Sequence, residues 1–199
     1  MTPRNENQNR QLREERREQI LQAALKVFSR RGLIATKIND IAKEAGLSHG
    51  LVYHYFNSKD EILTTLIERA LEGSKYVVHL ASQQNLSPID QLHWLMKTIL
   101  TGLSNDGAYL FLLTVQAFTS DTVPEQVKEM LTSKSTSTFE GILPIILAGQ
   151  QAVQIVKEDP TKLSSSYFAM IQCISLQQVQ QIDQLTPSDA DLILKIFKP

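Results

Sequence analysis

The sequence has little of what membrane, secreted or zinc-binding proteins require. Its 199 residues include one cysteine, Cys173, so neither an intramolecular disulfide nor a cysteine-based zinc site can form. No run approaches the roughly 18 apolar residues that a membrane-spanning helix needs. The polar, arginine-rich N-terminus has no apolar segment of the kind that secretory signals carry. These absences favour a protein of the reducing cytoplasm that makes no membrane contact.

Motifs of common enzymes are missing as well. The sequence contains no glycine-rich phosphate loop, no nucleophile elbow, no cluster of metal ligands and no glutamate–histidine pattern of di-iron helical proteins. His49 and His54 stand five residues apart, which places them on different faces of a helix and argues against a metal pair. With 42% hydrophobic and 21% charged residues, the chain nevertheless has enough apolar material for a folded core. We therefore expect a folded protein that is not an enzyme and uses no cofactor or metal.

Positive charge is concentrated near the N-terminus. Residues 1–60 hold 11 Lys+Arg against 7 Asp+Glu, whereas residues 61–199 hold 9 against 14, and seven of the eight arginines lie at or before Arg31. A basic head on an acidic body suggests that the head meets a polyanion. The early arginines, Arg13, Arg16 and Arg17, either reach phosphates as an arm or only add to the local positive field. The charges alone do not separate these readings.

Helical periodicity dominates the chain, and no strand-like alternation is evident. Residues 1–12 are polar and expected to be frayed, and a first helix from about Glu14 buries Ile20, Ala24, Val27 and Phe28 before ending at Gly32. Further boundaries are expected at Thr36, Gly46, Ser48, Ser58 with Glu61, Ser87-Pro88, Asn105-Asp106-Gly107, Thr122-Val123-Pro124, Pro144, Asp159-Pro160 and Thr186-Pro187. The pattern predicts an all-α fold of about nine helices.

Residues 38–57 have the pattern of a helix-turn-helix. Such a unit needs a small residue where its helices touch, which Ala42 supplies, and a turn residue with positive φ, which Gly46 supplies. Leu47 and Val52 are the apolar wedge between the helices. The second helix then projects His49, Gly50, Leu51, Tyr53 and His54 away from the core. A face of this composition suits contact with the major groove of DNA.

The residues that carry this unit resemble a known family. The motifs are Ile41-Ala42, Ala45-Gly46, Gly50-x-x-Tyr53-x-Tyr55-Phe56 and Ser58-Lys59-x-x-Ile62-Leu63. In these spacings the chain resembles the tetracycline-repressor (TetR/AcrR) family of bacterial transcriptional regulators over residues 14–75. The resemblance implies a three-helix DNA-binding head at residues 14–75 and a helical effector-binding and dimerisation body at residues 76–199.

The resemblance also implies which residues of the head meet DNA. Thr36 and Lys37 would bind backbone phosphate, Thr36 also capping its helix, and Lys59 would hold a phosphate at the start of the fourth helix. Ser48 would cap the recognition helix and touch phosphate. The whole set is Thr36, Lys37, Ser48, His49, Gly50, Leu51, Tyr53, His54 and Lys59. Lys59 is also explained as the second residue of a capped helix, and Tyr55 and Phe56 are expected in the core.

The body is expected to form a homodimer. Two apolar stripes run along residues 167–179. One contains Tyr167 and Met170, and the adjoining one contains Ala169, Cys173, Leu176 and Val179. Together they are too wide for a helix with one face in water. A second apolar patch lies near the C-terminus. The predicted interface is Tyr167, Met170, Ile171, Ile174, Leu192, Ile193 and Ile196. Burial of these residues within their own chain is the alternative.

An effector pocket is the second expectation for the body. Apolar aromatic side chains could line it, namely Trp94, Tyr109, Phe111, Phe118, Phe139 and Phe168, although each could equally be ordinary core. The few charges at interior positions favour a neutral or lipophilic effector. The sequence thus predicts a homodimeric repressor that binds a palindromic operator in double-stranded DNA and is released by a small molecule. A DNA-binding regulator without an effector, and an all-α enzyme or carrier, are the alternatives.

Overall fold

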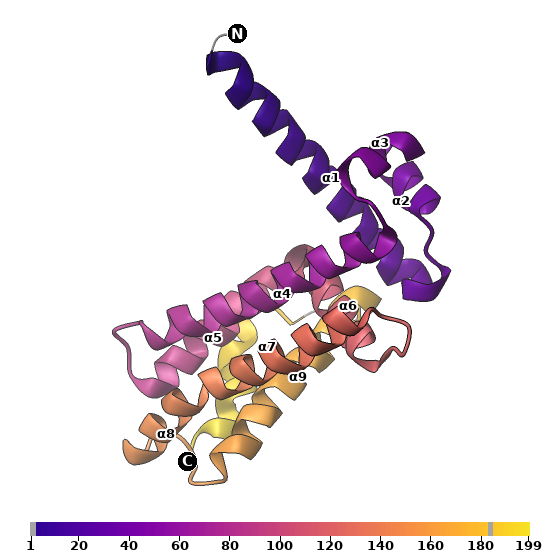
Figure 1. Ribbon diagram of the computed structural model, residues 1–199. Helices are drawn as coiled ribbons and strands as arrows, with labels where there is room; N and C mark the ends of the chain where they lie inside the picture. The colour runs from indigo at the N-terminus through magenta and orange to yellow at the C-terminus, as the bar shows by residue number, and fades with distance from the viewer. Residues whose placement is uncertain (1–2, 183–184) are drawn as a thin grey trace.

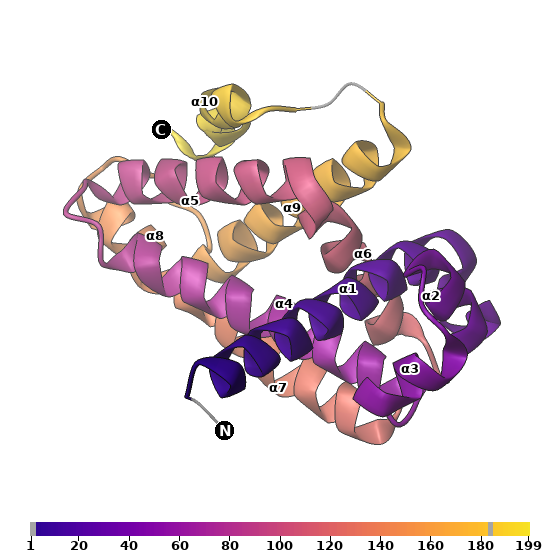
Figure 2. The same cartoon turned by 90° about the horizontal axis from the view of Figure 1, so that it is seen from above.

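Helices form nearly all of the chain (Figures 1 and 2). The computed structural model describes residues 3–182 and 185–199, and their side chains except those of residues 3–7, 105 and 134–137. The α-helices are α1 (Pro3–Ala35), α2 (Ile38–Glu44), α3 (His49–Tyr55), α4 (Lys59–Ser82), α5 (Pro88–Gly102), α6 (Ala108–Thr119), α7 (Glu125–Gly141), α8 (Leu143–Gln151), α9 (Pro160–Gln180) and α10 (Ala190–Ile193). Over these ranges no strand occurs, which confirms the predicted all-α fold. None of the described helices combines the length and apolarity that crossing a membrane requires.

Helix α1 is longer than the sequence pattern indicated. It begins at Pro3 and not near Glu14, so the expectation that residues 1–12 are frayed is wrong from Pro3 onward. Its N-terminal half projects away from the rest of the chain (Figure 1). The predicted end at Gly32 is confirmed by a φ of +76° there, which breaks the helical geometry before the last turn to Ala35.

Most other helix boundaries lie where capping residues and prolines in the sequence predicted them. Ser87 accepts a hydrogen bond from the Asp90 backbone N–H, and Asp159 accepts from those of Thr161 and Lys162, so both cap the helix that follows. Pro144 lies at the start of α8, directly after the predicted break. The break predicted at residues 105–107 is wrong, because residues 103–107 form a π-helical turn that joins α5 to α6 without leaving helical geometry.

Two hydrophobic cores divide the chain between them. The first core contains the apolar faces of α1 to α3 and the first half of α4 up to Leu71, together with residues of α6 and α7 such as Leu113 and Val127. The second core begins on α4 at Val78 and includes residues of α5, α8, α9 and the C-terminal segment. The predicted boundary near residue 75 lies between the two on α4. Helix α4 therefore spans both cores, as α6 also does with Ala108 in the second core and Leu113 in the first.

Tyr167 lies at the centre of the second core. Its side chain is wholly buried on α9, and its hydroxyl donates to the Leu92 carbonyl of α5 over 3.2 Å. Burial raises the pKa of the Tyr167 phenol well above its ordinary value, which keeps the group neutral and a hydrogen-bond donor. The ring meets Phe197 edge-on, with centroids 5.9 Å apart. This contact holds the C-terminal segment, which lies beside α5 in Figure 2, against the body.

Polar contacts join α1 to α4 at the point where α1 leaves the first core. Glu18 forms an ion pair with Arg69, and the Arg17 guanidinium donates to the Thr65 hydroxyl over 3.5 Å. Partial burial would raise the pKa of the Glu18 carboxyl. The hydrogen bonds from Arg69 and Gln22, with the charges of Arg69 and Arg17, outweigh that effect and hold the pKa below its ordinary value.

The Glu18→Gln variant tests the contribution of this ion pair to stability. Because the folded-state pKa lies below the unfolded one, the stabilisation is complete above the unfolded pKa, near 4.3, and is lost as the pH falls through the folded pKa. We expect the variant to unfold more easily at pH 7 by less than about 1 kcal/mol, since both side chains are partly exposed. The difference should be smaller at pH 3 than at pH 7. Urea unfolding at both pH values measures it.

Glu14→Gln is the matched control for that measurement. Glu14 is exposed on the same helix, so its substitution should leave the free energy of unfolding unchanged at either pH. An equal loss of stability at pH 7 and pH 3 in Glu18→Gln would assign the effect to packing and contradict the role of charge.

Candidate nucleic-acid interface

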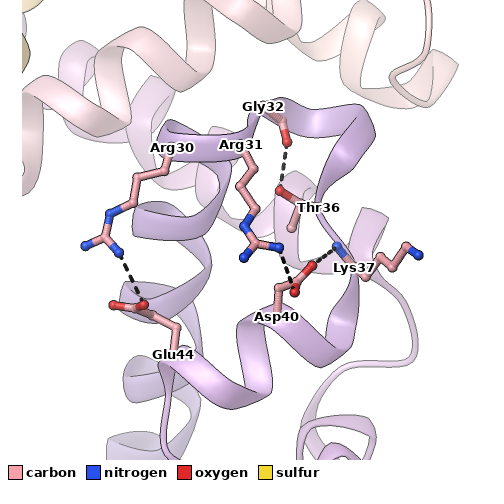
Figure 3. Close-up of polar contacts among 7 residues, drawn as sticks. All are labelled: Arg30, Arg31, Gly32, Thr36, Lys37, Asp40 and Glu44. Carbon is pink, nitrogen blue, oxygen red and sulfur yellow. Dashed lines mark hydrogen bonds and ion pairs between the residues drawn. The ribbon is translucent and has the colours of Figure 1, made fainter.

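Ion pairs fasten α2 to the end of α1 (Figure 3). Arg31 contacts the Asp40 carboxylate at 2.8 Å, and Arg30 contacts Glu44 at 3.4 Å. Asp40 also accepts from the Lys37 backbone N–H over 3.1 Å, which satisfies a free donor at the start of α2. The two arginines stand in the last turns of α1, where cations favour the negative end of a helix. The structure shows that they also set the position of α2.

Thr36 does not cap α2 as predicted. Helix α2 begins one residue later, and the Thr36 hydroxyl donates backward to the Gly32 carbonyl over 2.7 Å (Figure 3). The residue is only 2% exposed. It therefore closes the turn between α1 and α2, and its predicted phosphate contact would require this hydrogen bond to open.

The turn between α2 and α3 is closed by backbone hydrogen bonds. Leu47 N–H donates to the Ala42 carbonyl over 2.9 Å and Gly46 N–H to the Lys43 carbonyl over 3.1 Å, which is the Schellman pattern. Gly46 has a φ of +65°, as this pattern requires and as the sequence predicted. Ala42 is buried between the helices, where a larger side chain would push them apart. The helix-turn-helix predicted at residues 38–57 is thus present as α2, the turn and α3.

Helix α3 has one face in the first core and one face in water. Val52 and Phe56 are wholly buried and hold the helix on the head. The opposite face exposes His49, Gly50, Tyr53 and His54, and Leu51 is half-buried at its border. The imidazole of His49 meets the Tyr53 ring edge-on, with centroids 4.8 Å apart. The exposed face is therefore the one that the sequence assigned to DNA.

Residues at the ends of the helices complete the predicted DNA-facing set. Ser48 is exposed and accepts from the Leu51 N–H over 3.2 Å, which confirms it as the cap of α3. Lys37 is exposed in front of α2. Lys59 differs, because it is half-buried and its ammonium donates to the Leu33 carbonyl over 2.8 Å. One of its three donors thus ties the start of α4 to the end of α1, and its role toward phosphate stays a prediction.

Two contacts to α1 that the sequence did not suggest hold the chain on either side of α3. The Gln19 side chain donates over 2.8 Å to the carbonyl of Ala45, the C-terminal cap of α2, four residues before α3 begins. The Arg17 guanidinium lies over the Phe56 ring, just after α3, at 4.8 Å from the centroid. Both join residues far apart in sequence, so no local pattern could have indicated them. They hold the exposed face of α3 in a fixed direction.

Two surface cavities lie at the head. One of about 300 Å³ is lined by the paired charges of α1 and α2, among them Arg31 and Asp40. Another of about 140 Å³ lies between Lys59, Leu63 and the loop at Val123. Neither is lined by the aromatic residues predicted to form an effector pocket. Within the described residues no group of three or more His, Cys, Asp or Glu could hold a metal ion.

The six predicted pocket residues do not gather around one space. Trp94, Phe111 and Phe168 pack on the second core, whereas Tyr109 packs on the first. Phe118 is 61% exposed. Phe139 contacts Phe168 edge-on, with centroids 4.6 Å apart, and is 41% exposed. Only this pair stays a coherent candidate for an effector site.

The predicted dimer interface needs correction. Four of its seven residues are buried in the second core of their own chain, namely Tyr167, Ile171, Ile174 and Ile193, so a single chain does not expose them. Met170 is half-buried against the same core, while Leu192 and Ile196 are 57% and 59% exposed. On α9 the adjoining stripe of Ala169, Cys173 and Leu176 is exposed instead. Both stripes are apolar, and only tertiary packing decided which one turned inward.

Comparison with known proteins gives the same assignment for the head. The family model for bacterial regulatory proteins of the tetR family matches residues 20–66. The HTH-type transcriptional regulator HbdR of Aromatoleum sp. (strain CIB) is 39% identical over 79 residues, which are 40% of this chain. The match spans only about a third of that relative, 34% of its length.

Solved structures share the fold over nearly the whole chain. The TetR family regulator PfmR of Thermus thermophilus aligns with a TM-score of 0.76 at 22% identity, covering 88% of this chain and 97% of PfmR. AibR in complex with isovaleryl coenzyme A and operator DNA aligns with a TM-score of 0.75 at 17% identity, covering 92% and 99%. The family model and the regulator relatives thus match the head to the tetR family, and the solved structures show that nearly the whole chain has the fold of TetR family regulators.

Proposed function

We propose that this TetR-family transcriptional regulator is a cytoplasmic homodimer that represses genes from a palindromic operator and is released by a small molecule. The observation that carries the DNA-binding part is the exposed face of α3, which contacts from α1 to Ala45 before it and to Phe56 after it hold in place. An α-helix fits the major groove, where base edges are legible. A face pinned in one direction is pre-organised for such contact.

The residues of this face have distinct parts in the proposal. Gly50 has open space where a side chain would be, which allows the backbone to approach DNA closely. His49, Tyr53 and His54 offer donors and acceptors to bases or phosphates. Leu51 has no hydrogen-bonding group, so it contacts a thymine methyl group or remains silent. With few direct base contacts, DNA shape contributes to specificity.

Dimerisation would cover the exposed apolar surface of the body. Leu176 on α9 is 46% exposed and continues the small residues Ala169 and Cys173 along that helix. Leu192 and Ile196 extend the apolar surface near the C-terminus. A two-fold axis through this surface would pair each α9 with its copy, which self-complementary patches favour. It would also present two α3 helices to successive major grooves, roughly 34–36 Å apart.

An apolar effector would reach the body through its aromatic side chains. Phe139 is partly exposed, meets Phe168, and Phe168 in turn meets the buried Tyr167 with centroids 5.7 Å apart. These rings form a continuous apolar path from the surface to the second core. AibR, which shares the fold, has been solved with isovaleryl coenzyme A, a ligand with an apolar acyl end, and with operator DNA. We infer a neutral or lipophilic effector for this chain.

Tyr53→Ala tests the DNA-binding face. The purified protein should first enrich a short palindrome from a pool of random duplexes. On that duplex the variant should bind roughly thirtyfold more weakly, because each of the two protomers loses one contact worth about 1 kcal/mol. Its melting temperature should stay unchanged, since Tyr53 is 45% exposed. Fluorescence anisotropy and thermal melting measure the two quantities.

Val52→Ala is the control one position away. Val52 is wholly buried, so this variant should lose about 2 kcal/mol of stability while still binding the duplex when folded. Wild-type affinity in Tyr53→Ala would show that the DNA-binding face has been placed wrongly.

Leu176→Glu tests the dimer surface. A charge at the centre of this surface should separate the protomers, halve the mass measured by sedimentation, and weaken operator binding roughly a hundredfold through loss of bivalency. Leu86→Glu is the matched control, because Leu86 is also 46% exposed but lies in the loop between α4 and α5. If Leu176→Glu stays dimeric, the interface lies elsewhere.

Phe139→Ala tests the effector path. In a screen of lipophilic acids, acyl thioesters and steroids, a compound that raises the melting temperature should also weaken operator binding. We expect the variant to need at least about tenfold more of that compound, with unchanged operator affinity in its absence. Phe118→Ala, which removes an exposed aromatic of α6, should respond as wild type. If no compound changes operator affinity, the regulator acts without an effector.

A further inference from the structure

The N-terminal half of α1 separates its charges onto two faces. Arg10, Arg13 and Arg17 recur at intervals of three and four residues, which places them on one side of the helix, with Arg16 next to them. Glu14 and Glu18 lie on the adjoining side, where Glu18 is occupied by Arg69. Solvent exposure alone does not require this separation of charges. A helix face that binds a polyanion does require it, because its positive charges must gather on one side.

This face of α1 is free for a partner. Residues 8–16 are exposed, and the helix projects beyond the head (Figure 1). Arg10 and Arg13 make no hydrogen bond or ion pair with any described residue, and Arg16 contacts only Gln19 on its own helix, at 2.6 Å. An arginine left in water keeps all its donors available for bidentate contact with phosphate.

The root of this projecting helix contacts the chain on either side of α3. Gln19 donates to the Ala45 carbonyl at the end of α2, and Arg17 covers Phe56 just after α3. The arginine face therefore begins beside the DNA-binding helix and continues outward along α1. From residue 16 back to residue 3 the helix is roughly 21 Å long, about the length of six base pairs of DNA. This continuity favours the same partner for both surfaces.

We infer that residues 3–16 of α1, the N-terminal arm, bind the phosphate backbone of double-stranded DNA outside the base pairs that α3 reads, through Arg10 and Arg13. The inference rests on the proposed function, because it needs α3 on its operator. Phosphate contacts position a protein without reading sequence. The arm thus adds affinity and salt dependence to operator binding and leaves the preferred sequence unchanged.

Arg10→Gln/Arg13→Gln tests the arm on the duplex that the wild type selects. Glutamine keeps the helix propensity and removes the charges. We expect affinity at least about tenfold weaker in moderate salt. The slope of log affinity against log salt should become shallower by about 0.9 for each lost phosphate contact. Two arginines are removed from each protomer, so we expect a change of about 1.8 per protomer. Anisotropy titrations at several salt concentrations give both numbers, and duplex selection should return the same palindrome.

Two controls separate phosphate contact from a general electrostatic field. Glu14→Gln/Glu15→Gln removes two negative charges from the same arm. If the arm acts only through its net charge, this variant should bind more tightly and with a steeper salt dependence. If Arg10 and Arg13 contact phosphates, both quantities should stay close to those of the wild type. On a duplex trimmed to the selected palindrome, the wild type should lose affinity relative to one extended by about ten base pairs on each side. The arginine variant should bind both duplexes equally.

The outcomes also separate this inference from the proposed function. If the wild type binds its palindrome but the arginine variant keeps the wild-type slope, the arm does not touch DNA and only this inference fails. If the wild type enriches no palindrome and binds no duplex, the proposed function fails and the arm has no DNA to contact.

Discussion

Helix α4 takes part in both hydrophobic cores, and the arrangement of the whole chain depends on that sharing. Its first half buries Ile62, Leu66 and Ile67 in the first core, and its second half buries Val78 and Ala81 in the second. A straight helix of 24 residues cannot bend easily between them, because each turn is closed by its own backbone hydrogen bonds. The direction of the head relative to the body is therefore set by the packing of α4, together with the parts of α6 and α7 that the first core contains.

Ends of the helices in the head could be predicted because their signals are local. Ser48, Ser58 and Gly46 act within three or four residues of themselves, through a side chain that meets a nearby N–H or a backbone that turns at positive φ. The exposed face of α3 followed from the spacing of Val52 and Phe56 alone. For these features the sequence carried all of the necessary information.

Features that depend on distant residues could not be predicted in the same way. On α9 two adjoining stripes are apolar, and the packing of α6, α7 and α8 decides that Tyr167 and Ile171 face inward while Cys173 and Leu176 face water. Thr36 has the residue type of a cap, but the kink at Gly32 offered its hydroxyl a nearer carbonyl. The contacts of Gln19 and Arg17 with the chain on either side of α3 span 26 and 39 positions of the sequence, and no periodicity records them.

The composition of the first core limits how a signal could pass from body to head. Leu113 and Ala117 of α6 and Val127 and Leu131 of α7 are buried in it, together with the helices of the head. Turning the head alone would expose these side chains, at a cost of about 1.5–3 kcal/mol for each of the larger ones. A ligand in the second core would thus have to move α4 with the ends of α6 and α7 as one unit. In a dimer, such a movement changes the spacing of the two α3 helices more readily than the structure of either head.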